Sequence, residues 1–274
     1  MSPGNEEPFG IRGMGPIPTA PRTGLRRLSS LCVGLVVLGL LAQGAPAAEM
    51  TTDAVIDLLR VASEKNPPDF SGKDLSRLDL SGADFKRANL ARANLGGANL
   101  AGANLFGANM TGANLTGANL RRANLDVTLL GNADLTKADL TQASLFGALL
   151  TKATLVEANL SGARIIANLN NANLSRANLS NADMAADMRN QPMGLMRVFL
   201  TSADLTGANL TGANLARGDL SFANLSKADL TGANLLGADL SGANLEGAIF
   251  RSIRGRGEMK GLDTAKNVDK AIFE

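Results

Sequence analysis

A large residue, usually Leu, stands at every fifth position of this 274-residue chain from Phe70 to Ile165. Two positions earlier there is almost always Ala, and Asn or Asp lies between them, as in Ala103–Leu105 and Ala113–Leu115. On a helix, a period of five rotates successive Leu side chains by about 140°, and on a flat strand it reverses their face each time. The backbone must therefore turn once in every unit.

Each unit is then a short extended piece closed by a corner. Ala and Leu point to the same side of that piece because they are two residues apart, and the Asn or Asp between them points to the other side. Gly, Ser and Thr supply the corners, where they tolerate turn geometry. The sequence predicts an all-β solenoid with Leu and Ala stacked inside and polar side chains outside.

These Ala-Asn/Asp-Leu-x-Gly tandems resemble the pentapeptide-repeat family over residues 68–250. The resemblance implies a right-handed quadrilateral β-helix with about four units in each coil, so that about thirty-five units would make about nine coils. The family also includes DNA mimics that bind a type II topoisomerase and give quinolone resistance. That activity is the alternative function to test against the charge of this chain.

The two ends of the solenoid need covers, because a terminal coil exposes apolar residues and unpaired backbone groups. Residues 48–67 are predicted to form an N-terminal capping helix, with apolar residues at helical spacing between Thr52 and Lys65 and a stop at Pro67-Pro68. Residues 251–274 are predicted to be a C-terminal cap, tail or dimer contact. We interpret the charge run of Arg251, Arg254 and Arg256 as a solvated linker rather than a phosphate site.

The N-terminal segment has the three parts of a secretory signal in order. Arginines at 22–27 precede the apolar run Leu31–Ala42, and Ala45–Ala47 then offers small residues for cleavage. The run is short for a transmembrane span of about 20 residues. We expect residues 1–47 to be a signal peptide or an uncleaved anchor and the protein to be periplasmic or secreted, with membrane contact only if the segment is uncleaved. A disordered tail with an apolar patch is the alternative.

Composition argues against an enzyme. The chain has no His, and its one cysteine, Cys32, lies inside the apolar run, so general-base, triad and common zinc chemistry lose their usual groups. The carboxylates at 69, 74, 79 and 84 would lie on successive sides of a coil and would not converge. The methionines at 184, 188, 193 and 196 could bind Cu(I), but apolar packing is the interpretation we favour. We predict no catalytic residues, no metal and no cofactor.

The balance of charges argues against a nucleic-acid partner and against mimicry of DNA. Residues 68–250 contain 15 acidic and 15 basic residues, whereas DNA carries one charge per about 1.7 Å of axis. We therefore expect an exported scaffold that acts by protein–protein interaction, with no nucleic-acid partner. The protein partner is unknown, and self-association through the coil ends is a further option.

The repeat is interrupted at one place, and the candidate interaction site is predicted beside this interruption. Leu169 comes one residue early, and the pattern is then lost from 185 to 199, so an insertion is predicted there. With twenty residues per coil, Leu129 and Leu149 would stack at outward positions, beside a corner that carries Phe106 and Phe146. The insertion is predicted to fold back over this apolar stripe or to leave it open for a partner. Its contributing residues would be Met188, Met193, Leu195, Met196 and Phe199.

Overall fold

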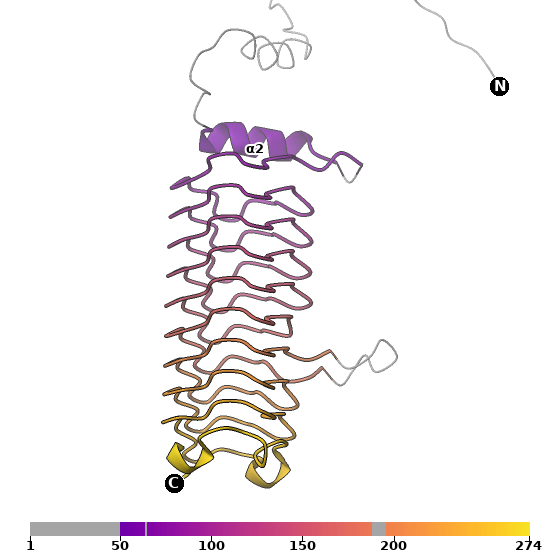
Figure 1. The fold of residues 1–274 in the computed structure, drawn as a ribbon. Coiled ribbons are helices and arrows are strands. Elements are labelled where there is room, and N and C mark those ends of the chain that lie inside the picture. Colours follow the sequence, from indigo (N-terminus) through magenta and orange to yellow (C-terminus); the bar gives the residue numbers. More distant parts are fainter. Residues whose placement is uncertain (1–49, 64, 188–195) are drawn as a thin grey trace, which may run out of the picture. The chain divides into compact units, whose positions relative to one another are not determined.

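The chain divides into two compact units, Met1–Ala48 and Glu49–Glu274. The computed structural model describes residues 50–63, 65–187 and 196–274. The signal peptide predicted at 1–47 and Cys32 lie outside these described residues. Within the described part of the second unit, one helix precedes a long stack of coils, and two short helical turns lie in the last coil (Figure 1).

Helix α2 spans Thr52–Val61. Its N-cap is Thr51, whose side chain accepts a hydrogen bond from the Ala54 N–H at 3.3 Å, and Asp53 lies in its first turn. Val55 is buried and belongs to the same apolar core as the coils. The predicted end near Lys65 was wrong, because the backbone is already extended at Ala62.

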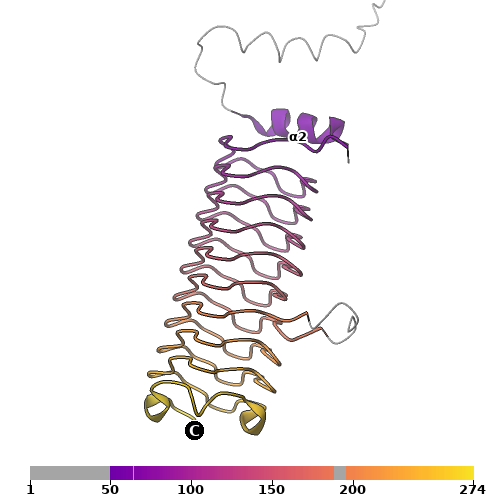
Figure 2. The same cartoon turned by 45° about the vertical axis from the view of Figure 1, so that its right-hand side comes forward.

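The coils are held by parallel backbone pairing between residues twenty positions apart. Asn114, for example, pairs with Asn94 in the preceding coil and with Asp134 in the next. The Leu115 N–H donates to the Asp134 carbonyl at 2.6 Å, and the Asn114 N–H donates to the Ala93 carbonyl at 3.0 Å. Four five-residue units therefore close each coil, and Figures 1 and 2 show the coils stacked with their sides aligned.

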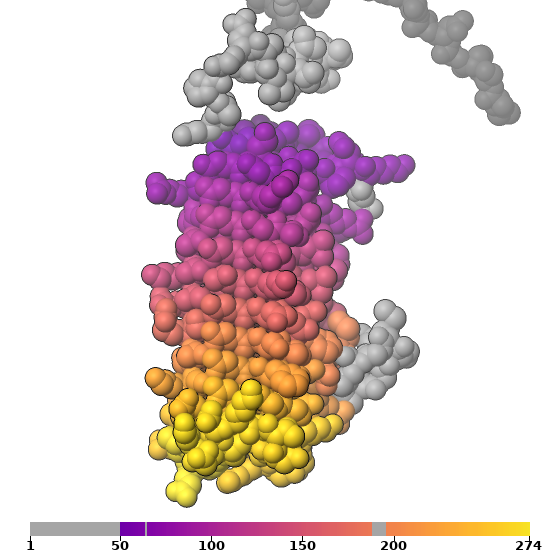
Figure 3. All heavy atoms as spheres, in the orientation of Figure 1, coloured from indigo at the N-terminus to yellow at the C-terminus, as the bar shows by residue number. Residues whose placement is uncertain are grey.

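Side chains divide between inside and outside as the repeat predicts. Leu115 and Ala113 are at most 1% exposed, whereas Asn114 between them is exposed. Along the stack the Leu and Ala positions are buried and the outward residues are partly or fully exposed, so the core is a continuous column of Leu and Ala with a few Phe and Met. On the face in view, the space-filling surface shows successive coils as bands in close contact (Figure 3).

Corners use the left-handed backbone region. The second corner residue has a positive φ, whether it is a glycine, as in Gly112 (66°), or not, as in Arg92 (58°). The preceding Asn or Asp closes the corner by accepting a hydrogen bond from the N–H two residues later, as Asn94 does from Gly96 at 3.2 Å. Outward Asn residues thus stabilise the turn that follows each side of the coil.

Asn side chains also form ladders along the outside, and these ladders have a direction. The Asn114 Nδ2 donates to the Asn94 Oδ1 of the preceding coil at 2.8 Å, and Asn94 donates to Asp74 at 2.9 Å. A residue in the first coil only has to accept, which a carboxylate does. This explains why all four outward positions of that coil are aspartates, namely Asp69, Asp74, Asp79 and Asp84.

The register changes twice, near the predicted break. Asn168 pairs with Leu149, only nineteen residues earlier, because the corner at Ile166-Ala167 is one residue shorter. Phe199 then pairs with Asn168, thirty-one residues earlier, so the inserted residues lie between these coils. Twenty-residue pairing resumes with Asp219.

Residues 251–274 continue the stack instead of leaving it. Arg254, Lys260, Lys266 and Ile272 each pair with the coil before them, at a spacing of six residues. The wider corners contain η2 (Arg256–Glu258) and η3 (Val268–Lys270). Arg254 and Arg256 are therefore part of the coil and not of a solvated linker. The Arg256 guanidinium lies 4.8 Å from the centre of the Phe273 ring, which stacks on Phe250 at 4.9 Å.

Candidate interaction surface

One side of the solenoid, here called face A, carries the outward Leu residues predicted as a site. Backbone pairing joins its outward residues in a single column, which runs from Asp69 through Asn89, Asn109, Leu129, Leu149, Asn168 and Phe199 to Asp219, Asp239 and Lys260. Leu129 and Leu149 pair directly with each other, and they are 41% and 45% exposed. They are held there by the ordinary coil bonds, since the Leu129 N–H donates to Ala108 at 3.0 Å and the Leu149 N–H to Thr128 at 2.9 Å.

The corner before face A adds further apolar residues. Phe106 and Phe146 lie at its first position, and both are partly buried. Val127 lies at its second position and is 47% exposed, and a β-carbon on Gly147 would be 3.7 Å from its Cγ2. Val127, Leu129 and Leu149 thus form an exposed apolar patch that spans two successive coils.

The Phe146 ring is covered from the neighbouring side of the coil. The Arg164 guanidinium lies 4.7 Å from the ring centre, an arrangement that favours a cation over an aromatic face. Arg164 also forms an ion pair with Asp187 at 3.3 Å, and the Asp187 side chain is only 7% exposed. Arg164 therefore covers Phe146, an aromatic side chain for which the sequence predicted contact with the insertion.

The insertion leaves from this same corner, as a two-stranded stem. Asp187 pairs antiparallel with Met196, and its N–H donates to the Met196 carbonyl at 2.7 Å. Ala186 still belongs to the coil, because its N–H donates to Ala216 at 3.0 Å. The ion pair to Arg164 fixes the stem to the coil next to Phe146.

Phe199 was wrongly assigned to the insertion. It occupies the outward position of face A, and Val198 before it fills the buried Ala position of the same unit. The unit escapes recognition in the sequence because Val and Phe replace the usual Ala and Asn. Arg197 lies over the Phe199 ring at 5.1 Å and pairs with Asp219 at 3.2 Å, so this aromatic ring is partly covered.

The predicted covering residues fall into two groups. Met188, Met193 and Leu195 lie outside the described residues, so cover of the stripe by the insertion stays a prediction. Met196 is described and partly buried, in the stem.

Sequence reasoning missed two residues of the same surface. Phe222 and Leu236 are 65% and 44% exposed and lie at the two corners that border face A, further along the stack. With Val127, Leu129 and Leu149 they are all the exposed large apolar residues that the structure describes between 68 and 250. The sequence did contain a signal, since Phe222 is a bulky residue at a position that is usually glycine. In the structure its φ is 59°.

Other features of the described residues offer less. The carboxylates at 69, 74, 79 and 84 lie on four different sides, and no group of three acidic, His or Cys side chains could hold a metal ion there.

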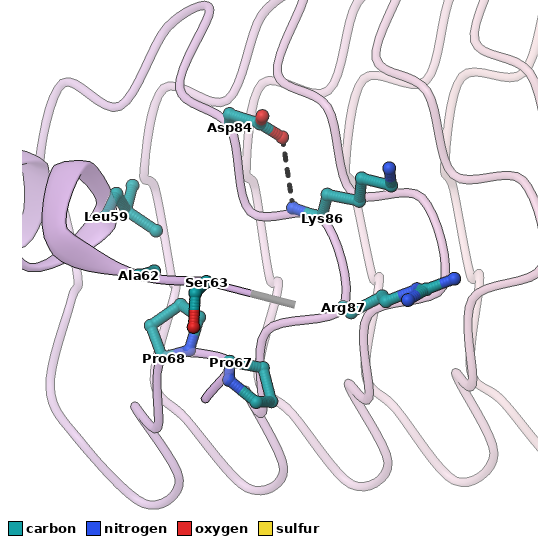
Figure 4. Close-up of a pocket in the computed structure, with 8 residues that line it drawn as sticks. All are labelled: Leu59, Ala62, Ser63, Pro67, Pro68, Asp84, Lys86 and Arg87. Atoms are coloured by element: carbon teal, nitrogen blue, oxygen red, sulfur yellow. Dashed lines mark hydrogen bonds between the residues drawn. The ribbon is translucent and has the colours of Figure 1, made fainter. Parts of the chain in front are cut away.

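A cavity of about 230 Å³ lies between the end of α2 and the first coils (Figure 4). It is lined by Leu59, Ala62, Ser63, Pro67, Pro68, Asp84, Lys86 and Arg87. Among the described helices, none is long and apolar enough to span a membrane.

Comparison with known proteins identifies the repeat. The model of the family described as pentapeptide repeats matches in 8 copies, over residues 69–95, 88–126, 128–165, 167–185, 195–232 and 214–251. The chain belongs to the pentapeptide-repeat family. No curated protein sequence matches it.

Two solved structures illustrate the similarity. HetL, a pentapeptide repeat protein involved in heterocyst differentiation regulation from the cyanobacterium Nostoc sp. strain PCC 7120, is 32% identical. The match covers 81% of this chain and 94% of HetL, with a TM-score of 0.36. Full-length QnrB1, a plasmid-mediated fluoroquinolone resistance protein, is 22% identical over 73% of this chain and 92% of its own, with a TM-score of 0.56. The similarity to QnrB1 supports the fold alone.

Proposed function

We propose that this protein is an exported, non-enzymatic scaffold that binds another protein through the flat sides of its coils. In this proposal the coils form a right-handed quadrilateral β-helix of about nine coils, closed at its N-terminal end by α2. The observation that carries the proposal is the concentration of exposed apolar residues on face A and its two corners. Apolar groups collected on one side of a protein mark an interaction surface more often than scattered ones do.

A partner can be captured at this surface directly. A photo-crosslinking amino acid replaces Leu149 on face A or, as a matched control, Asn114 on another side, since both side chains point outward. We expect a crosslinked protein partner from position 149 and little or none from position 114. Equal yields from the two positions would contradict binding through face A, and no protein adduct from any outward position would contradict the scaffold itself.

Export is supported by the basic, apolar and small-residue segments at 22–47. Alkaline phosphatase fused after residue 60 gives the test, because the enzyme is active only where its disulfides form. We expect phosphatase activity outside the cytoplasm, and the same fusion without residues 1–47 should be inactive. Activity that does not depend on residues 1–47 would contradict the signal.

Mimicry of DNA is the alternative function, and the fold shared with QnrB1 is its support. The balance of 15 acidic and 15 basic residues over 68–250 argues against it, because a mimic needs a dense array of carboxylates. Addition of the purified protein to a DNA gyrase supercoiling reaction separates the two functions. We expect no inhibition, and inhibition at micromolar protein would favour the mimic.

A further inference from the structure

Between Asn89 and Phe199, face A differs in charge from the other three sides of the coil. Its outward column from Asn89 to Phe199 contains Asn, Leu and Phe only. Over the same coils, each of the other three columns of described residues carries at least one charge. These charged outward residues are Asp134, Asp139, Arg164, Asp183 and Asp204.

Cations border this uncharged column at both corners. Arg92 and Lys152 lie at the corner after face A, and both are exposed with positive φ. A β-carbon on Gly112 would be 3.5 Å from the Arg92 Cγ, so the Arg92 side chain extends along the corner toward the next coil. Arg87 lies at the corner before face A.

Two acidic residues also border the column, but the carboxylates of both are engaged. Asp187, at the corner before face A, forms an ion pair with Arg164 at 3.3 Å. Asp126 accepts hydrogen bonds from the Ser144 hydroxyl at 2.6 Å and from the Phe146 N–H at 2.9 Å. The border that a partner meets is therefore mainly cationic, around an apolar centre formed by Leu129 and Leu149.

We propose that face A between Asn89 and Asn168 binds an amphipathic α-helix whose apolar stripe is flanked by Glu or Asp. This proposal builds on the protein-binding scaffold proposed above and names the chemistry of its partner. The helix would lie along the stack, with its apolar stripe on Leu129, Leu149 and Val127 and its acidic residues near Arg92 and Lys152.

The dimensions of the surface fit such a helix. Coils repeat every 4.8 Å or so, close to the helical pitch of about 5.4 Å, so successive helical turns meet successive coils. The four coil steps from Asn89 to Asn168 span roughly 19 Å, which corresponds to about thirteen helical residues. Apolar residues at i, i+3, i+4 and i+7 would then form the contact.

Two other occupants fit less well. A second copy of face A would bring its cationic borders against each other, and like charges that meet across an interface cost affinity. A membrane surface would require protruding apolar side chains, yet Leu129 and Leu149 are more than half shielded by their neighbours. A narrow helix can reach such half-shielded side chains.

Two synthetic helical peptides of 18 residues test the proposal by fluorescence anisotropy with the complete mature protein. Both carry Leu at i, i+3, i+4 and i+7, and they differ only in Glu or Lys at the flanking positions. We expect the Glu peptide to bind at least about tenfold more tightly than the Lys peptide, with a difference that shrinks as salt rises. Equal binding of the two peptides would overturn the proposal, as would binding to anionic phosphatidylglycerol vesicles without binding to the Glu peptide.

Variants that restore the repeat pattern keep the fold intact while they change the surface. Leu129→Asn with Leu149→Asn should weaken the binding of the Glu peptide by about tenfold or more, because the variant lacks the two apolar side chains that anchor the helix. Arg92→Gly with Lys152→Gly should weaken the binding of the Glu peptide by roughly threefold to tenfold and make this binding less dependent on salt. The matched control, Arg77→Gly with Lys227→Gly, removes two exposed cations of positive φ from another corner and should bind like the parent.

The same variants separate this proposal from the scaffold function. Unchanged peptide binding in the Leu129→Asn, Leu149→Asn protein would overturn the helix site. If that protein still captured a partner in cells from a crosslinking amino acid at Asn114, the scaffold would stand and another side of the coil would be the binding surface.

Discussion

Face A and the Asn-lined side next to it use the same backbone for different outward residues. Asn94 and Asn114 on that side each accept from the corner N–H that follows, and they bond to each other at 2.8 Å. The side chains of Leu129 and Leu149 have no hydrogen-bond donor or acceptor, yet the backbone pairing of both residues is unchanged. The difference teaches that the outward position is not needed to close a coil, so its identity is available for recognition.

The largest expected effect separates the inward from the outward position. Leu115→Asp should destabilise the protein by about 4 kcal/mol or more, because an unpaired carboxylate would enter an all-aliphatic core. Asn114→Asp should change stability by less than about 1 kcal/mol, because that side chain faces water. Thermal unfolding followed by circular dichroism measures both, and equal losses of Tm would contradict the division between inside and outside.

An exchange of outward residues between the two sides should have a smaller effect with opposite signs. Asn94→Leu with Asn114→Leu removes turn and ladder hydrogen bonds and should cost about 1–2 kcal/mol. Leu129→Asn with Leu149→Asn supplies such bonds and should leave stability equal or raise it by up to about 1 kcal/mol. Denaturant unfolding compares the two. A clear loss of stability in the second variant would show that the Leu pair supports the fold and is not free for recognition.

The smallest expected effect is a dependence on pH at the first coil. The backbone N–H of Ser71 lowers the pKa of Asp69, and the hydroxyl of the serine two residues later does the same for Asp74 and Asp79. Because the folded pKa values lie below the ordinary value of about 3.9, these carboxylates stabilise the fold above that pH. This contribution should disappear as the pH falls through the lowered values.

The measurement is Tm from pH 7 to pH 2.5 for the parent and for the variant in which Asp69, Asp74 and Asp79 become Asn. The parent should lose more Tm on acidification, since the neutral amides do not titrate in this range. Superimposable curves would mean that these hydrogen bonds do not favour the charged carboxylates.

Most of the candidate site could be predicted because it depends on counting residues. Positions twenty apart stack, so Leu129 and Leu149 were placed side by side, and the departure of the insertion beside Phe146 followed from the same arithmetic. Phe199 could not be placed, because counting fails across an insertion whose length is not a multiple of the repeat. Arg164 could not be assigned to Phe146 either, since their contact depends on how a long side chain bends around a corner.

The sequence by itself determined the inside and the outside of this protein, because a five-residue period with Leu and Ala two apart leaves the backbone only one way to bury them. It also placed the break in the register between Ile165 and Leu200. Only the tertiary structure decided that Phe199 returns to face A, that Arg164 joins Phe146 to Asp187, and that the six-residue spacing of 251–274 adds to the stack. These features depend on contacts between coils, which no local pattern encodes.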